Sequence, residues 1–282
     1  MPTIDLPYID AEIEKLDAGD RPPGYWRHFH WGLFEDPSRT DDSPDRYLAA
    51  AEAMTERIVG AGGVAGGSSV LDVGCGFGGT LDHIRWRHRG CRLVGVNIDL
   101  RQLQWGRRLV AEAAGEVAGL ESAVLDPIWF VTGDGCRLPV ADGTVDHVLA
   151  VECVFHFPSR KAFFREAARV LRPGGTLALS DFLVAPDALA TVAENVAEFW
   201  VGSWYGSSAR PLTAAGYQRL ARGTGFEPLV DEDVTERTLP TYPALRRIYG
   251  ELGQTEAVAS VAGVEALARA GGWEYHVLAF RR

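Results

Sequence analysis

The stretch at residues 70–80 reads VLDVGCGFGGT, an apolar run that ends in four glycines within six residues. A short, continuous apolar run suits a strand that is buried on both faces of a parallel sheet. Glycines that follow a strand directly and precede a helix permit positive φ and let backbone amides approach a ligand closely. The stretch therefore predicts a first strand with a ligand site at its carboxyl end; a tight turn with close helix packing is the alternative.

Further apolar runs extend this pattern along the chain. Segments with helical spacing lie between them, such as 100–118 and 159–171, the second capped by Ser159 and ended by the RPGG turn at 172–175. The alternation predicts an α/β fold of the Rossmann-like, doubly wound type, with a mostly parallel seven-stranded sheet and an antiparallel last strand. We expect the strands at 69–73, 92–98, 127–131, 145–151, 176–183, 226–234 and 273–281.

Two regions fall outside the repeating unit. Residues 1–60 precede the first strand and are rich in aromatic side chains, and residues 185–210 follow the fifth strand. Ligands of such sheets bind beyond the carboxyl ends of the strands, where insertions cover them. We therefore expect an N-terminal helical cap at 1–60, and a domain at 61–282 that carries a lid insertion at 185–210.

The composition limits the classes of function. The 282 residues carry 28 Lys and Arg against 38 Asp and Glu, a net charge of −10, and no basic cluster offers a nucleic acid a surface. The four cysteines are dispersed without CxxC spacing, so we expect no metal site and reduced thiols in a cytoplasm. The N-terminus lacks a secretory signal pattern, and no apolar run is long enough for membrane insertion. The abundance of Ala, Gly and Arg favours a bacterial source, and the sequence leaves a homodimer open.

Three blocks of sequence carry a family resemblance. They are VLDVGCGFGG at 70–79, LVGVNIDLRQL at 93–103, and GDGCRLPVADGTVDHVLAVECVFHFPSRKAFFREAARVLRPGGTLALSDF at 133–182. In this order and at these intervals they resemble class I S-adenosylmethionine-dependent methyltransferases, in particular small-molecule enzymes of the ubiquinone, tocopherol and sterol type and of natural-product tailoring. The resemblance covers roughly residues 68–183 and implies S-adenosyl-L-methionine as the cofactor.

The resemblance also implies which residues hold the donor. The loop after the first strand would lie beneath the methionine portion, and residues after the next two strands would hold the ribose and the adenine. The implied cofactor-binding residues are Asp72, Gly74, Gly76, Asn97, Asp99, Gln102, Asp134, Gly135, Cys136 and Glu152.

One of these positions departs from the family pattern. The acid that usually holds the ribose hydroxyls falls at Asn97, which can donate and accept hydrogen bonds but carries no charge. Either Asn97 and Gln102 share the ribose, or Asp99 takes part. The alternatives are that Asn97 or Asp99 caps the following helix and that Asp134 lies in a turn. The glycine loop also nearly fits G-x-G-x-x-G, so a nicotinamide-dependent oxidoreductase is the rival interpretation.

A methyl transfer depends on alignment and on exclusion of water, and an acceptor hydroxyl or protonated amine also needs a base. His156 follows Glu152 just past the end of the fourth predicted strand, where this fold places reactive groups. We expect His156 to position the acceptor or to remove its proton; the alternative is a loop histidine that braces Glu152. By contrast, His83 lies beside Arg85 on the helix after the glycine loop, which predicts a solvated face.

The aromatic segment GYWRHFHWGLFEDP at 24–37 supplies a second candidate group. Its aromatic residues would ordinarily pack on a core, but Tyr25 and His30 add polar groups that could serve catalysis. Aromatic residues of the 185–210 insertion would face them across an apolar pocket. The expected acceptor-binding residues are His28, Trp31, Phe155, Trp200, Trp204 and Tyr205.

Together these features predict a methyltransferase that moves a methyl group to O, N or C of a small, mainly apolar natural product, such as an aromatic, indole, polyketide or terpenoid. The alternative from another class is a protein that binds the S-adenosyl cofactor without methylating, such as a cyclase or a regulator.

Overall fold

The computed structural model describes residues 6–19, 27–116, 125–188 and 210–282. The seven strands are β1 (Ser69–Val73), β2 (Arg92–Asn97), β3 (Ile128–Thr132), β4 (Val145–Val151), β5 (Leu171–Val184), β6 (Glu227–Asp233) and β7 (Trp273–Arg281). The helices are α1 (Pro7–Ala18), α2 (Pro44–Ala61), α3 (Gly79–Arg87), α4 (Leu100–Glu116), α5 (Arg160–Val170), α7 (Ala214–Arg222), α8 (Thr235–Thr238), α9 (Thr241–Glu251) and α10 (Thr255–Arg269), with 3-10 turns η3 (Val154–His156) and η4 (Pro186–Ala188).

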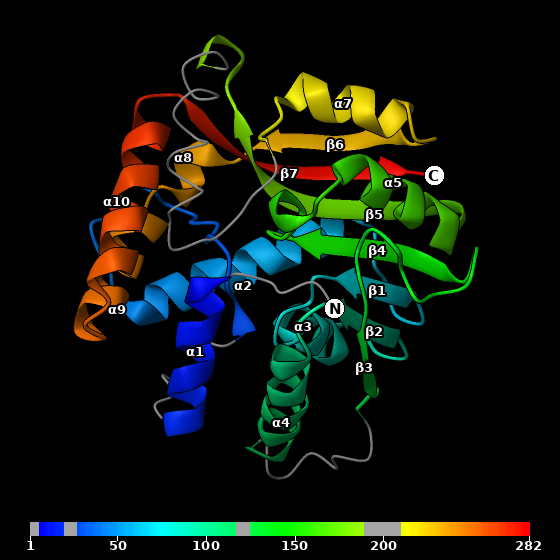
Figure 1. The fold of residues 1–282 in the computed structure, drawn as a ribbon, viewed down its shortest axis with the longest axis horizontal. Helices are drawn as coiled ribbons and strands as arrows, with labels where there is room; N and C mark the ends of the chain where they lie inside the picture. Colours follow the sequence, from blue (N-terminus) through cyan, green and yellow to red (C-terminus); the bar gives the residue numbers. More distant parts are fainter. Residues whose placement is uncertain (1–5, 20–26, 117–124, 189–209) are drawn as a thin grey trace.

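All seven strands form one sheet in the order β3-β2-β1-β4-β5-β7-β6 (Figure 1). The pairs among β1 to β5 are parallel, and β7 runs antiparallel to both β5 and β6. The sequence order reverses between β1 and β4, which is the point where ligands bind in open α/β sheets. The predicted fold class, including the antiparallel last strand, is confirmed.

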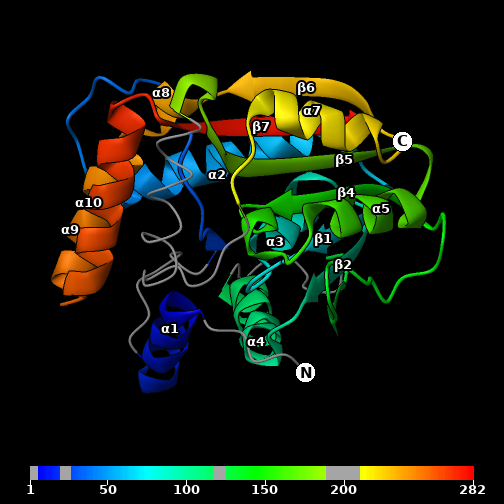
Figure 2. The same ribbon diagram turned by 45° about the horizontal axis from the view of Figure 1, so that its top comes forward.

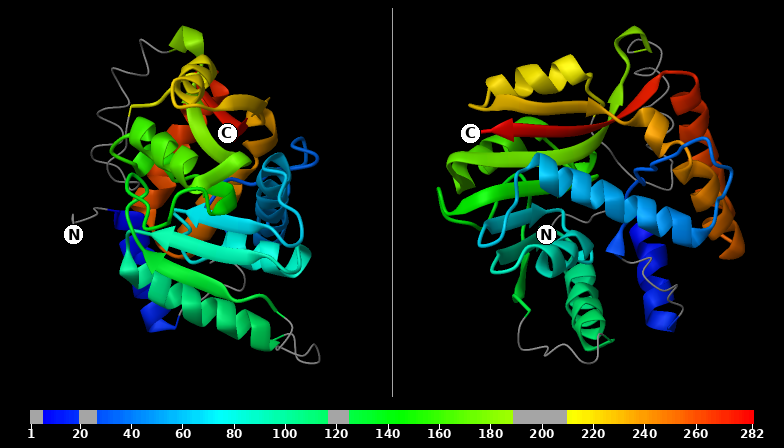
Figure 3. Two further views of the ribbon diagram at one scale, coloured as in Figure 1. Left: turned by 90° about the vertical axis from the view of Figure 1, so that its right-hand side faces the viewer. Right: turned by 180° about the vertical axis from the view of Figure 1, so that it is seen from behind.

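Helices cover both faces of the sheet (Figure 3). α2, α3 and α4 lie on one face, and α5 and α7 lie on the other. Each face has its own hydrophobic core, because the buried strands present apolar side chains to both sides. α2 begins at Ser43, whose hydroxyl accepts from the backbone amide of Arg46, and the predicted Ser159 cap of α5 accepts from the amide of Ala162.

Three helices gather at the end of the sheet toward which the arrow of β4 points (Figures 1 and 2). α9 and α10 pack on each other there, and α1 lies beside them. This arrangement covers the carboxyl ends of the parallel strands, where the ligand site is expected. The predicted lid at 185–210 falls mostly outside the described residues. The division into a cap at 1–60 and a domain at 61–282 stays a prediction. α2, most of which belongs to the predicted cap, packs directly on the sheet.

Candidate active site

The loop between β1 and α3 has left-handed backbone at three glycines, with φ of 74° at Gly74, 53° at Gly76 and 86° at Gly78. A Cβ atom on Gly74 would lie 2.7 Å from Sγ of Cys153, and one on Gly78 would lie 2.6 Å from the ring of Phe130. Among the residues that the structure describes, a Cβ atom on Gly76 would meet only Oε1 of Gln102, at 3.9 Å. Neighbouring side chains thus require bare backbone at Gly74 and Gly78, whereas Gly76 faces space that a ligand can use.

Asp72 ends the apolar part of β1 with a buried carboxyl group. The residue is 2 % exposed, and its carboxyl oxygens form no hydrogen bond or ion pair with any residue that the structure describes. Burial raises the pKa of Asp72 to about 7. A buried carboxyl without a partner is costly and is typical of a functional site. Asp72 lies two residues before Gly74, so its carboxyl group could bind a polar part of a cofactor. This agrees with the prediction that the loop after β1 is the donor site.

The ribose side of the predicted donor site lies at the end of β2. The side-chain amide of Asn97 donates to Oε1 of Gln102, and both residues are buried. Asp99 is engaged elsewhere, because its Oδ1 accepts from the backbone amide of Arg101 at 2.8 Å and its carboxylate pairs with the Arg101 guanidinium. This geometry favours Asn97 with Gln102 over Asp99, which acts as a helix cap.

The adenine side lies after β3. Oδ1 of Asp134 accepts from the backbone amide of Cys136 at 2.8 Å, which is the turn geometry considered as the alternative for this residue. Asp134 is exposed, so its other oxygen can still reach a ligand. Gly135 is buried, and a Cβ atom there would lie 2.9 Å from the ring of Phe157. The loops after β1 and β3 therefore meet the same segment after β4.

That segment, residues 152–157, crosses directly over the glycine loop. The thiol of Cys153 donates to the carbonyl of Val73 at 3.1 Å, and its Sγ covers Gly74. The ring of Phe157 lies 3.8 Å from the position of a Cβ on Gly74. His156, one residue before Phe157 and in the η3 turn, therefore borders the predicted donor site.

Glu152 opens this segment in a strained conformation. Its φ of 47° is the one positive value among the non-glycine residues that the structure describes. Oε2 accepts from the backbone amide of Trp31 at 2.9 Å and from the hydroxyl of Tyr275 at 2.6 Å. Burial raises the pKa of Glu152 to about 8, so the carboxyl is mostly protonated at neutral pH. These contacts favour a role in holding segment 152–157 against the N-terminal segment rather than a direct cofactor contact.

α1 covers the site from the N-terminal side. Ile9, Ile13 and Leu16 pack against Phe77 of the glycine loop and Leu109 of α4. The Arg101 side chain pairs with Asp10, and the Trp105 indole donates to Asp17, so α1 is also held to α4 by polar contacts. Tyr8 of α1 is partly buried beside the same cluster, and its hydroxyl lies 3.2 Å from Nε2 of His156.

The two predicted polar groups of the N-terminal segment that the structure describes are interior. Nδ1 of His30 lies 3.1 Å from the carbonyl of Trp31, and Nε2 lies 3.0 Å from the hydroxyl of Thr55, which also contacts Nδ1 of His28 at 3.1 Å. Burial lowers the pKa of His30 to about 4 and that of His28 well below its ordinary value. Both ring nitrogens of His30 are engaged with the protein, and His28 is buried with its Nδ1 at Thr55, so this geometry disfavours His30 as a catalytic base and His28 as an acceptor contact.

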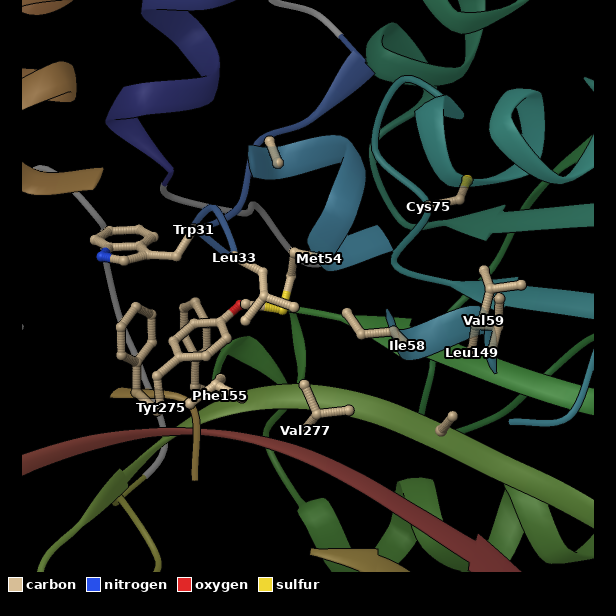
Figure 4. Close-up of a cluster of buried hydrophobic side chains, with 14 of the residues drawn as sticks. Trp31, Leu33, Met54, Ile58, Val59, Cys75, Leu149, Phe155, Tyr275 and Val277 are labelled. Atoms are coloured by element: carbon tan, nitrogen blue, oxygen red, sulfur yellow. The ribbon is translucent and has the colours of Figure 1, made fainter. Parts of the chain in front are cut away.

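Trp31 and Phe155 join an aromatic cluster near Glu152 (Figure 4). The ring centroid of Phe182 lies 4.9 Å from that of Trp31 and 4.9 Å from that of Tyr275. The ring centroid of Phe155 lies 6.0 Å from that of Phe182. α9 adds Tyr242 at 5.6 Å from Trp31. The other predicted site residues, Tyr25, Trp200, Trp204 and Tyr205, lie outside the described residues.

Three residues at this site carry no signal in the sequence. Tyr8, Tyr275 and Tyr242 come from α1, β7 and α9, and each reaches the site through a contact between segments that are distant in the chain. The alternation of β7 could have indicated that Tyr275 shares a face with Val277 and Ala279, but not that its hydroxyl meets Glu152.

Two observations concern the rest of the molecule. Within residues 6–19, 27–116, 125–188 and 210–282, no three His, Cys, Asp or Glu side chains cluster in a way that could ligate a metal ion. Over the same ranges, no helix combines the length and apolar character that crossing a bilayer requires.

Comparison with known proteins identifies relatives over most of the chain. A family model described as "Methyltransferase domain" matches residues 71–179. The chain is 36% identical over 239 residues to Methyltransferase GfsG of Streptomyces halstedii, across 84% of this chain and 78% of that protein. It is 32% identical over 217 residues to 27-O-demethylrifamycin SV methyltransferase of Amycolatopsis mediterranei, across 76% of this chain and 72% of that protein. Other relatives are named as O-, N- and C-methyltransferases.

Among solved structures, the [4+2]-cyclase SpnF superposes with a TM-score of 0.75 and covers 98% of this chain and 93% of its own. Its sequence identity is 22%, so this likeness bears on the fold alone.

Proposed function

Because the chain belongs to the class I S-adenosyl-L-methionine-dependent methyltransferases and takes its methyl group from that donor, we propose that it methylates a small, mainly apolar natural product at a group beside His156. The single observation that carries this proposal is the passage of segment 152–157 over the glycine loop, with Sγ of Cys153 at 2.7 Å from the Cβ position of Gly74. It brings an imidazole to the edge of the donor loop.

In this proposal, the donor is held by the residues around that loop. The buried Asp72 and the open backbone of Gly76 suit the methionine portion, and the Asn97 and Gln102 pair suits the ribose. Asp134, beside the buried Gly135, suits the adenine. The donor supplies a methyl group on a positively charged sulfonium, and the protein's contribution is to align the acceptor and to exclude water.

On the acceptor side, His156 positions the acceptor or takes its proton. The aromatic cluster supports an apolar acceptor, since Trp31 and Tyr275 pack edge to face with Phe182 and Tyr242 packs against Trp31. The names of the S. halstedii and A. mediterranei relatives support natural-product biosynthesis, and we place the enzyme in the cytoplasm of a bacterium, where its four free cysteines stay reduced. A homodimer remains a prediction.

Calorimetric titration with S-adenosylhomocysteine separates the two sides of this site. We expect Asp72→Asn and Asp134→Ala to raise the dissociation constant of S-adenosylhomocysteine about tenfold, because each removes a carboxylate from the donor site. His156→Ala should leave that constant within about twofold, because the imidazole faces the acceptor.

Turnover is measured with tritium-labelled S-adenosylmethionine and a panel that contains 27-O-demethylrifamycin SV, apolar phenols and their amine analogues. His156→Ala should lower transfer to a panel member by about 100-fold or more. Unchanged donor binding by both donor-site variants, or unchanged transfer by His156→Ala, would overturn the corresponding assignment.

A further inference from the structure

The contact between Tyr8 and His156 has the geometry of a substrate contact. The phenol oxygen lies 3.2 Å from Nε2, and the two rings are nearly parallel, with an interplanar angle of 18° and centroids 6.0 Å apart. A hydroxyl group that gives its proton to an imidazole must lie at about this distance from one ring nitrogen. Tyr8 thus presents to His156 the same functional group, at the same separation, as an alcohol or phenol acceptor would.

The attachment of α1 does not depend on this contact. Ile9, Ile13 and Leu16 form the buried face of the helix, and Asp10 and Asp17 bond to Arg101 and Trp105 of α4. Tyr8 is partly buried beside this cluster, and its hydroxyl lies against the segment after β4. Because the other contacts hold α1, a side-chain rotation can move the Tyr8 hydroxyl away from His156 while α1 stays packed on the glycine loop.

The Tyr8 phenol keeps its proton in this contact, because burial, helped by the nearby Glu152, raises its pKa above the ordinary value. An acceptor hydroxyl in the same place would likewise arrive protonated, and it would need the imidazole to take its proton as the bond to the methyl carbon forms.

We propose that the Tyr8 hydroxyl occupies the place beside His156 that the acceptor's hydroxyl takes when it binds, and that the reaction is O-methylation of an alcohol or phenol. This inference rests on the proposed function, because it assumes that His156 faces the acceptor. In the reaction the acceptor oxygen forms a bond to the methyl carbon as the carbon–sulfur bond breaks, the sulfur keeps the electron pair, and the hydroxyl proton moves to Nε2 of His156.

The surroundings favour a hydroxyl over an amine. An alkylamine arrives as an ammonium ion at neutral pH and needs a carboxylate beside it. Glu152, the carboxyl group that lies four residues before His156, is mostly neutral at that pH and already accepts from Trp31 and Tyr275. A neutral hydroxyl has no such requirement and needs only the imidazole.

Binding of three bicyclic probes tests the proposal. 2-Naphthol, 2-naphthylmethylamine and naphthalene carry the same bicyclic ring and differ in the group that would replace the Tyr8 hydroxyl; the amine is an alkylamine and is protonated at neutral pH. Affinities are measured by tryptophan fluorescence with saturating S-adenosylhomocysteine, for the wild type and for Tyr8→Phe. Because the variant removes a competing hydroxyl, it should bind 2-naphthol about three- to tenfold more tightly, with the affinities for naphthalene and 2-naphthylmethylamine changed less than about twofold. Adding His156→Ala should abolish the gain.

Tyr47→Phe is the matched control. It removes a buried hydroxyl that contacts the carbonyls of His28 and His30, in the same N-terminal assembly but away from His156. Tyr47→Phe should leave the affinities of the three probes in the same order as in the wild type.

Three outcomes overturn the inference: weaker 2-naphthol binding by Tyr8→Phe, an equal gain for naphthalene, or 2-naphthol binding that is undetectable in both proteins. Failure of the proposed function is distinguishable, because it would appear as wild-type protein that does not bind S-adenosylhomocysteine in the first place.

Discussion

At the scale of single residues, the glycines of the loop after β1 differ in what lies beside the place where a side chain would be. Gly79 is required by the protein, since a Cβ atom there would lie 1.6 Å from the carbonyl oxygen of Arg27. Gly74 and Gly78 are required by Cys153 and Phe130 in the same way. Gly76 is different, because its described neighbours leave room: its φ of 53° favours glycine by itself, and the open space beside it is where we propose that the donor lies.

Gly76→Ala and Gly63→Ala form a matched pair that tests this difference. Both glycines have positive φ, 53° and 70°, and an alanine at either should cost about 1–2 kcal/mol of backbone strain. Gly63 precedes the amino end of β1, with no atom within 4 Å of its Cβ position. By calorimetric titration, Gly76→Ala should raise the dissociation constant of S-adenosylhomocysteine at least about tenfold, and Gly63→Ala should leave it unchanged. Equal affinities of the two variants would contradict the assignment of Gly76.

Glu152 gives a prediction about stability against pH. Its pKa rises from 4.5 to about 8 on folding, so the folded protein holds a proton that the unfolded chain releases. This contribution to stability is fully present below pH 4.5 and is lost as the pH rises toward 8. Gln at this position keeps an oxygen that accepts from Trp31 and Tyr275, without a titration. The melting temperature of Glu152→Gln minus that of the wild type should therefore increase by several degrees between pH 5 and pH 8.

The control for this prediction is Glu14→Gln on the exposed side of α1, which should show no such trend. A Glu152→Gln difference that stays constant with pH would mean that the buried carboxyl is ionised throughout.

The sequence can propose residues for the donor site because those residues stand in local motifs next to strand ends. Asp72 and Gly76 are fixed by one short stretch, and Asn97 and Gln102 lie five residues apart, so their pairing follows from local geometry. The contacts of His83 could not be predicted this way. Its basic neighbours indicate a solvated face, yet the residue is buried and contacts Glu56 of α2 at 2.7 Å.

At the scale of elements, α1 packs on the glycine loop and so covers the proposed donor site, and its attachment can be tested. Ile13 is 7 % exposed, against Phe77 of the glycine loop. Ile13→Asp places a charge in that contact, so α1 should detach and the dissociation constant of S-adenosylhomocysteine should rise about tenfold, with a small loss of melting temperature because the cluster is peripheral. Calorimetry and limited proteolysis within residues 6–19 measure the two effects.

Ala18→Asp adds the same charge at an exposed position of α1 and should leave the affinity unchanged. Equal affinities of Ile13→Asp and Ala18→Asp for S-adenosylhomocysteine would mean that α1 does not contribute to donor binding.

The strand and helix pattern was largely predictable, and the exceptions have physical causes. β5 begins at Leu171 rather than 176, because Leu171 pairs with Val145 before a register shift and the RPGG turn forms an irregular start to the strand. α9 and α10 stand between β6 and β7, in a stretch for which the sequence pattern predicts only weak helices. α9 packs on α10 and on α2, and a sequence that is taken one segment at a time does not show such a match.

At the scale of the whole molecule, the site depends on parts from both ends of the chain. The N-terminal segment contributes Trp31, whose backbone amide holds Glu152, and β7 contributes Tyr275, which holds the same carboxyl group. The parallel part of the sheet positions the glycine loop, and α1 and α9 lie at the end of the sheet toward which the arrow of β4 points, on the side where we propose that the acceptor binds (Figures 1 and 2). The motifs of the sheet predict the donor, whereas the acceptor side arises from long-range packing.

A crystal structure of the protein soaked with S-adenosylhomocysteine tests the central claim most directly. The account predicts density for the homocysteine part against Gly76 and Asp72, the ribose at Asn97 and Gln102, and the sulfur directed toward His156. Density for the ligand in another place, or a sulfur that faces away from His156 with segment 152–157 unchanged, would contradict it.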